Sequence, residues 1–156
     1  MRRSILRHYI GNRDELVDAL ADKVISDYRQ ETESVFTNVT DKERTRYLID
    51  LLLPATAMGT TQQLLIIEAL IGAAGEFPKV RKLVFEYIDD YIQLVAKQLK
   101  QISPGRGRQT YWDVAYGLVC ISFNHESLQP LALPSHYLRG ARKIARSLID
   151  SLNSES

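Results

Sequence analysis

The sequence contains a single cysteine, Cys120, which excludes an internal disulfide and a metal site built from several thiolates. It also lacks a long apolar run. The longest one, residues 64–74, is interrupted by Glu68 and is too short to cross a bilayer. Arg7 and His8 interrupt the apolar segment that a signal peptide would require after Met1. We therefore expect a cytoplasmic protein in which Cys120, set among apolar residues, is a core residue rather than a nucleophile.

Catalytic and cofactor-binding motifs are also missing. The chain has no Gly-rich nucleotide-binding loop, no His-Glu-x-x-His and no Cys-x-x-Cys. The histidines His8, His125 and His136 are scattered. Residues 105–108, Gly-Arg-Gly-Arg, suit a solvated loop better than a phosphate site, because we expect no aromatic residue or helix N-terminus beside them. The sequence indicates no enzyme, metal or cofactor, and a small helical enzyme ranks lowest among our hypotheses.

Charge is nearly balanced over the whole chain, with 20 basic and 19 acidic residues, so the protein as a whole is not a polyanion binder. The distribution along the chain is uneven. Residues 1–13 carry a charge of +4, whereas residues 14–45 hold nine acids and four bases, a net charge of −5. A basic end followed by an acidic stretch suits a DNA-facing tip on a body that repels DNA. The alternative is an arginine-rich N-terminus that is merely solvated.

Apolar residues recur at helical spacing along the chain, and no segment alternates as a strand does. We predict an all-α helical bundle. Thr40 with Glu43 reads as a capping box, and Pro54, Pro78 and residues 103–108 read as breaks. The predicted helices cover residues 2–10, 13 to about 30, 40–53, near 59 to 75, 78 to about 102, 110 to about 128 and 135 to about 152. Residues 64–71 are apolar nearly all round, which predicts a central, buried helix.

A sharp corner between two helices is predicted near the N-terminus. Gly11 suits the left-handed residue that closes the first helix, and Asn12 with Glu15 forms a capping box that opens the next. Residues 6–16, Leu-Arg-His-Tyr-Ile-Gly-Asn-Arg-Asp-Glu-Leu, resemble the signature of the TetR/AcrR family of transcriptional regulators. That signature, roughly Leu-Tyr-His-Tyr-Phe-Gly-Ser-Lys-Glu-Glu-Leu, joins the recognition helix of a helix-turn-helix to the long fourth helix. Arg7 replaces the usual Tyr.

The resemblance implies a domain division and a set of DNA contacts. Residues 1–12 would be a remnant of the helix-turn-helix, and residues 13–153 a TetR-like ligand-binding and dimerisation domain. In the family two more helices precede the recognition helix. These two helices are absent from this sequence, and three explanations stay open. The chain is truncated, or its start was assigned too late, or it is a natural variant without a DNA-binding domain. On a complete chain the residues that contact DNA would be Arg2, Arg3, Ser4, Arg7, His8 and Arg13.

In this family a small effector binds within the helical body and moves the DNA-binding tips. Glu68 is a carboxylate in an otherwise apolar helix, where unpaired carboxylates are rarely buried. It lies on an exposed edge, or forms a structural pair, or anchors a ligand in a cavity. The residues of the candidate effector pocket are Glu68, Tyr87, Tyr91, Trp112 and Asn124. The competing interpretation for each is an ordinary core position.

The last predicted helix carries a narrow apolar stripe at three- and four-residue spacing, residues 138–152, which suits pairing with a partner helix. The alternative is that this stripe packs only on its own core. The resemblance favours a homodimer whose interface candidates are Leu118, Ile121, Leu138, Ala141, Ala145, Leu148 and Leu152. The predicted function is a dimeric, effector-responsive DNA-binding regulator, expected to be a repressor. The alternative is a helical dimerisation or ligand-binding module with no DNA binding of its own.

Overall fold

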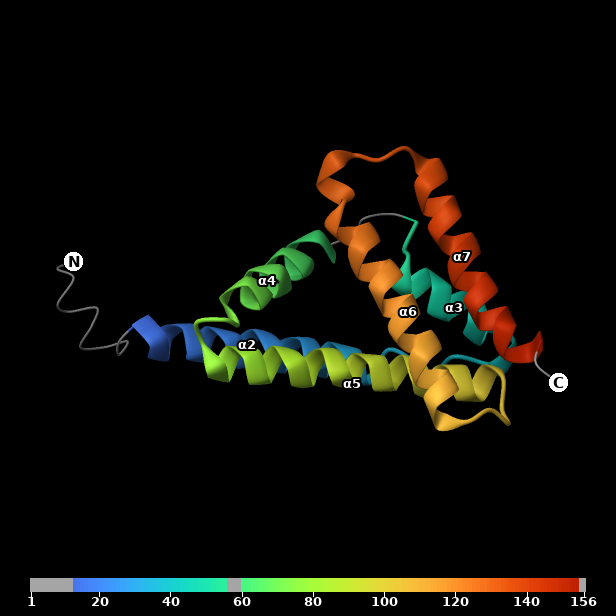
Figure 1. The fold of residues 1–156 in the computed structure, drawn as a ribbon, viewed down its shortest axis with the longest axis horizontal. Helices are drawn as coiled ribbons and strands as arrows, with labels where there is room; N and C mark the ends of the chain where they lie inside the picture. Colours follow the sequence, from blue (N-terminus) through green and yellow to red (C-terminus); the bar gives the residue numbers. More distant parts are fainter. Residues whose placement is uncertain (1–12, 56–59, 155–156) are drawn as a thin grey trace. The chain divides into compact units, whose positions relative to one another are not determined.

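The computed structural model describes residues 13–55 and 60–154. This part of the chain forms six α-helices and one short 3-10 helix, and none of it is β-strand (Figure 1). The predicted all-α fold class is therefore confirmed. The elements are α2 (Arg13–Glu33), α3 (Asp41–Leu52), α4 (Thr60–Ala73), α5 (Pro78–Ile102), α6 (Arg108–Ser127), η1 (Gln129–Leu131) and α7 (Ser135–Ser154). None of these helices is both long and apolar enough to cross a membrane.

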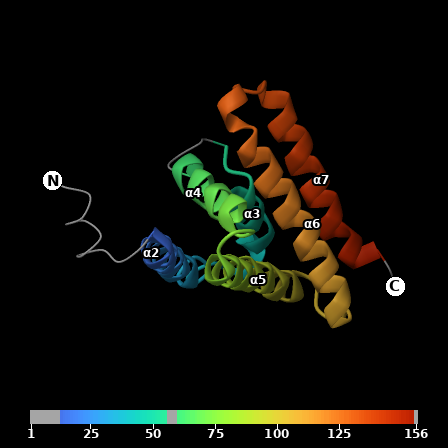
Figure 2. The same ribbon diagram turned by 60° about the vertical axis from the view of Figure 1, so that its left-hand side comes forward.

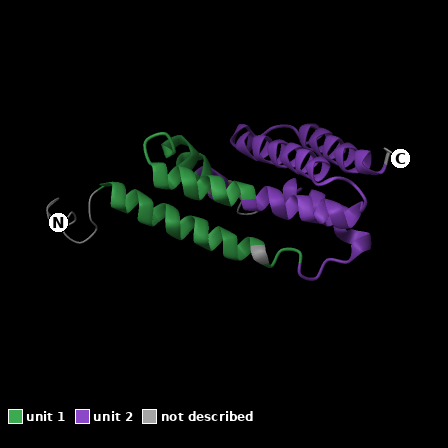
Figure 3. Ribbon diagram, turned by 60° about the horizontal axis from the view of Figure 1, so that its bottom comes forward, with its two compact units in different colours: residues 1–36, 66–89 green, residues 37–65, 90–156 purple. Residues whose placement is uncertain are grey.

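The chain divides into two compact units (Figure 3). Unit 1 comprises residues 1–36 and 66–89, and its described part contains α2, the second half of α4 and the first half of α5. Unit 2 comprises residues 37–65 and 90–156, and it contains α3, the rest of α5, α6, η1 and α7. The predicted boundary between residues 12 and 13 stays a prediction, because residues 1–12 lie outside the described part.

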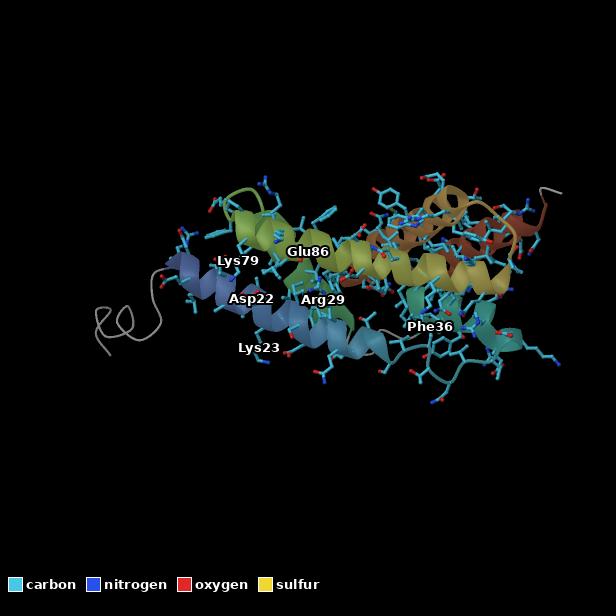
Figure 4. All side chains as sticks on the ribbon, turned by 90° about the horizontal axis from the view of Figure 1, so that it is seen from below. Asp22, Lys23, Arg29, Phe36, Lys79 and Glu86 are labelled. Carbon is cyan, nitrogen blue, oxygen red and sulfur yellow. The ribbon has the colours of Figure 1, made fainter. Side chains whose placement is uncertain are left out.

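In unit 1, α2 and the first half of α5 lie side by side and run in the same direction (Figure 1). Asp22 of α2 pairs with Lys79 of α5, and Arg29 pairs with Glu86. From the first ion pair to the second, α2 and α5 each advance by seven residues, as expected for two parallel helices in constant register (Figure 4). Ala21 and Ile25 of α2 are fully buried beside this contact, one helical turn apart.

Unit 2 is built around α3, α6 and α7. The largest fully buried side chains of these three helices are Leu48, Ile49 and Leu52 of α3, Leu118 of α6, and Ile149 and Leu152 of α7. Burial of each such side chain contributes about 1.5–3 kcal/mol. The start of α3 is fixed by Arg44, whose side chain is only 11% exposed. Arg44 donates to the Gln98 Oε1 atom at 2.6 Å and to the Val39 carbonyl at 3.0 Å, so this buried cation has polar partners.

The C-terminal end of α3 is held by side chains of α6 and α7. The last carbonyls of an α-helix have no partner within the helix. Ser122 of α6 donates its hydroxyl hydrogen to the Leu52 carbonyl at 2.6 Å. Arg142 of α7 donates to the Leu53 carbonyl at 3.2 Å and to the carboxylate of Asp50. The helix dipole also stabilises a positive charge, such as that of Arg142, at the C-terminal end of a helix.

A second junction joins the loop between α5 and α6 to the end of α7. Ser103 and Arg106 both donate to the Leu152 carbonyl, at 3.3 and 2.6 Å. Tyr111 donates its hydroxyl hydrogen to the Ser103 carbonyl at 2.6 Å and accepts from the Arg106 backbone N–H at 3.0 Å. The prediction that residues 105–108 form a solvated loop is therefore wrong at Arg106, which is tied to the last turn of α7.

Several local predictions are corrected by the structure. Gly107, not Thr110, is the N-cap of α6, so the N-terminus of this helix lies within the Gly-Arg-Gly-Arg segment. Thr40 caps α3, but its hydroxyl donates to the Glu43 carboxylate at 2.7 Å instead of accepting a backbone N–H. The expectation that α4 is buried all round is also wrong. Leu65 is 52% exposed and Ile71 41% exposed, because neighbours cover only one side of the helix.

We expect Arg142→Met to lower the free energy of unfolding by about 1–2 kcal/mol, since it removes the charged donor from two acceptors at the end of α3 but keeps an aliphatic stem. Arg139→Met is the matched control on the same helix. The Arg139 side chain is exposed and donates to the Ser135 hydroxyl, so its loss should change stability by less than about 0.5 kcal/mol. Urea unfolding followed by circular dichroism measures both. Equal losses would contradict the role assigned to Arg142.

Candidate functional site

Five of the six predicted DNA-contacting residues, Arg2, Arg3, Ser4, Arg7 and His8, lie outside the described residues, as does the corner at Gly11 and Asn12. The sixth, Arg13, is the first residue of α2. Its side chain is largely exposed and lies 3.7 Å from the Glu76 carboxylate. Its guanidinium also lies 5.6 Å from the centroid of the Phe77 ring, within cation–π range. Arg13 therefore has partners within unit 1.

The predicted effector-pocket residues are distributed over both units. Glu68 and Tyr87 belong to unit 1, and both are half-buried. The Tyr87 ring packs on Tyr28 of α2 with centroids 6.1 Å apart. Tyr91, Trp112 and Asn124 belong to unit 2. The effector site stays a prediction, since the structure describes each of these side chains only within its own unit.

Within unit 2, the two pocket candidates on α6 occupy different places. Asn124 is exposed, whereas Trp112 is half-buried beneath the guanidinium of Arg108 at 5.6 Å. Twelve residues of α-helix separate them, about 18 Å along the axis. A compact small molecule does not reach both positions.

Helices α6 and α7 form an antiparallel pair, and they lie side by side in both Figure 1 and Figure 2. The close approach is marked by Gly117 and Leu148, because a Cβ added at Gly117 would lie 3.7 Å from the Leu148 Cδ1 atom. Three of the seven predicted dimer residues, Leu118, Ala145 and Leu152, are at most 2% exposed. Their side chains belong to the core of this chain and do not reach its surface. Ile121, Leu138, Ala141 and Leu148 are half-buried.

An apolar surface remains on the outside of this pair. We call it the α6–α7 face, and it consists of Tyr116, Cys120, Asn124 and Leu128 on α6 and Tyr137, Ala141, Ile144 and Leu148 on α7. Positions 116, 120 and 124 share one side of α6, and positions 137, 141, 144 and 148 share one side of α7. Tyr116 is 60% exposed and Ile144 is 57% exposed. The exposure of Cys120 shows that its assignment to the core was wrong.

The Tyr116 phenol and the Cys120 thiol are neighbours one turn apart on this face. Contact with Cys120 is the main cause that raises the pKa of Tyr116. A raised pKa keeps the Tyr116 phenol neutral at pH 7, so this side chain adds no charge to the α6–α7 face. The surface has the composition of the centre of an interface, where aromatic residues are common and charged residues rare.

Sequence reasoning did not identify Glu126, a half-buried carboxyl on α6. Burial raises its pKa from 4.5 to about 7. A signal in the sequence that could have found Glu126 is its spacing of seven residues from Val119. This spacing places Glu126 on the same side of α6 as the buried Val119. Sequence reasoning also missed Ser122 and Arg142 as donors to the end of α3, because their acceptors lie about 70 and 90 residues away in the chain.

Glu126→Gln should stabilise the protein at pH 8 and change its stability little at pH 4. Between pH 4.5 and about 7 the folded carboxyl retains a proton that the unfolded chain has lost, so stability falls as pH rises through this range. The partial exposure of the side chain reduces the expected gain at pH 8 to about 1 kcal/mol. Thermal unfolding at both pH values tests this. Asp113→Asn removes the same charge from an exposed position of α6 and should change stability by less than about 0.5 kcal/mol at both pH values.

Comparison with models of known protein families, with curated proteins and with solved structures found no match to this chain. The likeness of residues 6–16 to the TetR/AcrR signature therefore stands as a resemblance carried by that segment alone. Within the described residues, no group of three or more His, Cys, Asp or Glu side chains is placed to hold a metal ion.

Proposed function

We propose that this chain is the regulatory body of a TetR-like, DNA-binding transcriptional regulator, a homodimer whose affinity for DNA responds to a small effector. The observation that carries the proposal is the exposed apolar α6–α7 face, which suits pairing of two copies into a four-helix arrangement. The segment resembling the family signature, residues 6–16, supports the same interpretation from the sequence.

The full length of the α6–α7 pair, which includes the α6–α7 face, has nearly the dimensions of a dimer interface. Each helix has 20 residues, which corresponds to about 30 Å of length. Two packed helices present a surface about 20 Å wide. The resulting area approaches the roughly 800 Å² per partner that specific interfaces bury. Gly140 and Cys120, both small and exposed, would allow the copies to approach closely.

A second candidate is a helical dimerisation or ligand-binding module that does not contact DNA. The arrangement of Arg13 favours it, because this predicted phosphate-binding residue is engaged by Glu76 and Phe77 within unit 1. Under the first candidate the same side chain must exchange Glu76 for a phosphate. Arg13 is exposed and begins a helix, where the dipole also favours an anion, so this exchange costs little.

Light scattering of the purified protein should give twice the 17.8 kDa chain mass. Ile144→Glu and Tyr116→Glu should each weaken dimerisation at least tenfold, because each would bury a charge at the interface. Phe85→Glu is the matched control. Phe85 is 67% exposed on α5 and lies outside the α6–α7 face, so its substitution should leave the dimer intact. A monomeric wild-type protein, or equal disruption by all three variants, would contradict the proposal.

The DNA-binding part of the proposal is tested with protein purified from its native cells, after its intact mass has been measured. Fluorescence anisotropy with duplex DNA should show affinity that falls steeply with salt. Arg13→Gln should weaken binding uniformly across sequences and reduce the salt slope by about one. Arg139→Gln removes a cation from α7 and should leave that slope unchanged. Dimers without any salt-dependent DNA binding would support the second candidate instead.

A further inference from the structure

The connection between α6 and α7 contains a segment with only apolar side chains. We call residues 130–134, Pro-Leu-Ala-Leu-Pro, the η1 tip, and four of these five residues are exposed. Leu131 is 68% exposed, and no large apolar side chain among the described residues is more exposed. The tip lies at one end of the α6–α7 pair (Figure 2). Exposed apolar side chains that are gathered in one place, unlike scattered ones, mark interaction surfaces.

The backbone of the η1 tip is constrained by hydrogen bonds. The Leu131 N–H donates to the Leu128 carbonyl at 3.0 Å, and the Ala132 N–H donates to the Gln129 carbonyl at 2.9 Å. The Gln129 side chain is hydrogen-bonded to the His125 ring at 3.0 Å, which ties the start of the tip to the last turn of α6. The two prolines of the tip also fix their own φ angles. A loop that is already ordered loses little conformational entropy on binding, which favours association.

The α6–α7 pair alone falls short of the area that a stable dimer buries. A length of about 30 Å and a width of about 20 Å give about 600 Å², whereas specific interfaces bury about 800 Å² per partner. The η1 tip extends this surface, because Leu128 and Tyr137 of the α6–α7 face flank it in the chain and are both exposed. A second copy of this chain is therefore the occupant that fits the tip, since it would cover the face and the tip together.

The opposite end of the α6–α7 pair is polar. Gln109 donates to the Asp113 carboxylate at 2.8 Å on the exposed surface of α6. Positions 109, 113, 116 and 120 share one side of this helix, so the polar pair continues the α6–α7 face. Ser151, near the end of α7, is also exposed. The surface thus changes from apolar at the η1 tip to polar at its other end.

Two copies can pair with like ends together or with opposite ends together. With opposite ends together, each η1 tip would cover Asp113 of the other copy and remove water from a charged carboxylate, which is unfavourable. With like ends together, the tips pack on one another, and the polar ends meet at the rim, where interfaces remain solvated. We propose that the η1 tips of two copies pack against each other and complete the dimer interface of the α6–α7 face. This contact rests on the proposed dimerisation, and it fixes which ends of the helices meet.

Disulfide formation between copies of the full chain measures the contact. In a Cys120→Ser background, Leu131→Cys places one thiol on each tip, and two such thiols join where their Cα atoms come within about 7 Å. Under mild oxidation, at concentrations where the protein is dimeric, this variant should form covalent dimers roughly tenfold or more faster than Phe85→Cys. Phe85 is the matched control, because it is 67% exposed and lies outside the α6–α7 face. Equal rates would overturn the tip contact, since random collision would explain them.

The alignment of the helices is tested with a mixture of two proteins that both carry Cys120→Ser. One protein carries Leu131→Cys, and the other carries Gln109→Cys together with a tag that changes its mass. Pairing with like ends together predicts covalent dimers of the Leu131→Cys protein and no mixed product above the collision rate of Phe85→Cys. A mixed disulfide as the main product would mean that opposite ends meet, and the proposal would then be wrong.

Loss of the leucine side chain should also weaken the dimer. Leu131→Ser should raise the dimer dissociation constant about tenfold or more, because the burial of leucine at the interface is lost. Leu20→Ser is the matched control, since Leu20 is 57% exposed on α2 in unit 1, and it should leave the constant unchanged. Analytical ultracentrifugation over a dilution series measures both constants.

The outcomes separate the tip contact from the proposed function. A dimer that Ile144→Glu disrupts but Leu131→Ser leaves unchanged would overturn the tip contact alone, and the proposed function would stand. A monomeric wild-type protein would contradict the proposed function, and the tip contact with it.

Discussion

Carbonyl groups at the end of an α-helix have no partner within the helix, and the assembly of unit 2 depends on how two such ends are satisfied. At the end of α3, donors come from Ser122 of α6 and Arg142 of α7. At the end of α7, the Leu152 carbonyl accepts from Ser103 and Arg106 in the loop between α5 and α6. Each acceptor requires a donor at one position of another element, so these bonds fix which turns of the helices meet. Apolar packing fills the space between them but is less specific about position.

Unit 1 is ordered by a different kind of interaction. Along α2 the fully buried residues are Ala21 and Ile25, which is little apolar surface for a helix of 21 residues. The contacts with α5 include two partly exposed ion pairs and the packing of Tyr28 on Tyr87. Such ion pairs contribute little to stability, at most about 1 kcal/mol each.

Packing also determines which part of the α6–α7 pair is left for a partner. One side of each helix packs against other residues of the same chain, since Leu118 of α6 and Ile149 of α7 are fully buried. The remaining outer surface carries Tyr116 and Ile144, which are more than half exposed. Large apolar side chains gathered on one face are a common mark of an interaction surface. The proposal of a dimeric regulator rests on this surface together with the segment of residues 6–16, and each of these observations is independent of the other.

The sequence by itself determined the all-α class and most helix boundaries, because these depend on local periodicity, on Pro54 and Pro78, and on capping residues such as Thr40. It also placed a narrow apolar stripe on the last helix. Only the tertiary structure decided which of two adjacent apolar stripes is buried. In α7, residues 144 and 145 differ by only 100° about the axis, yet Ala145 is buried and Ile144 is exposed. The pairings of Arg142 with α3 and of Asp22 with Lys79 were likewise decided by the fold, since a contact between residues more than 50 positions apart leaves no local signal in the sequence.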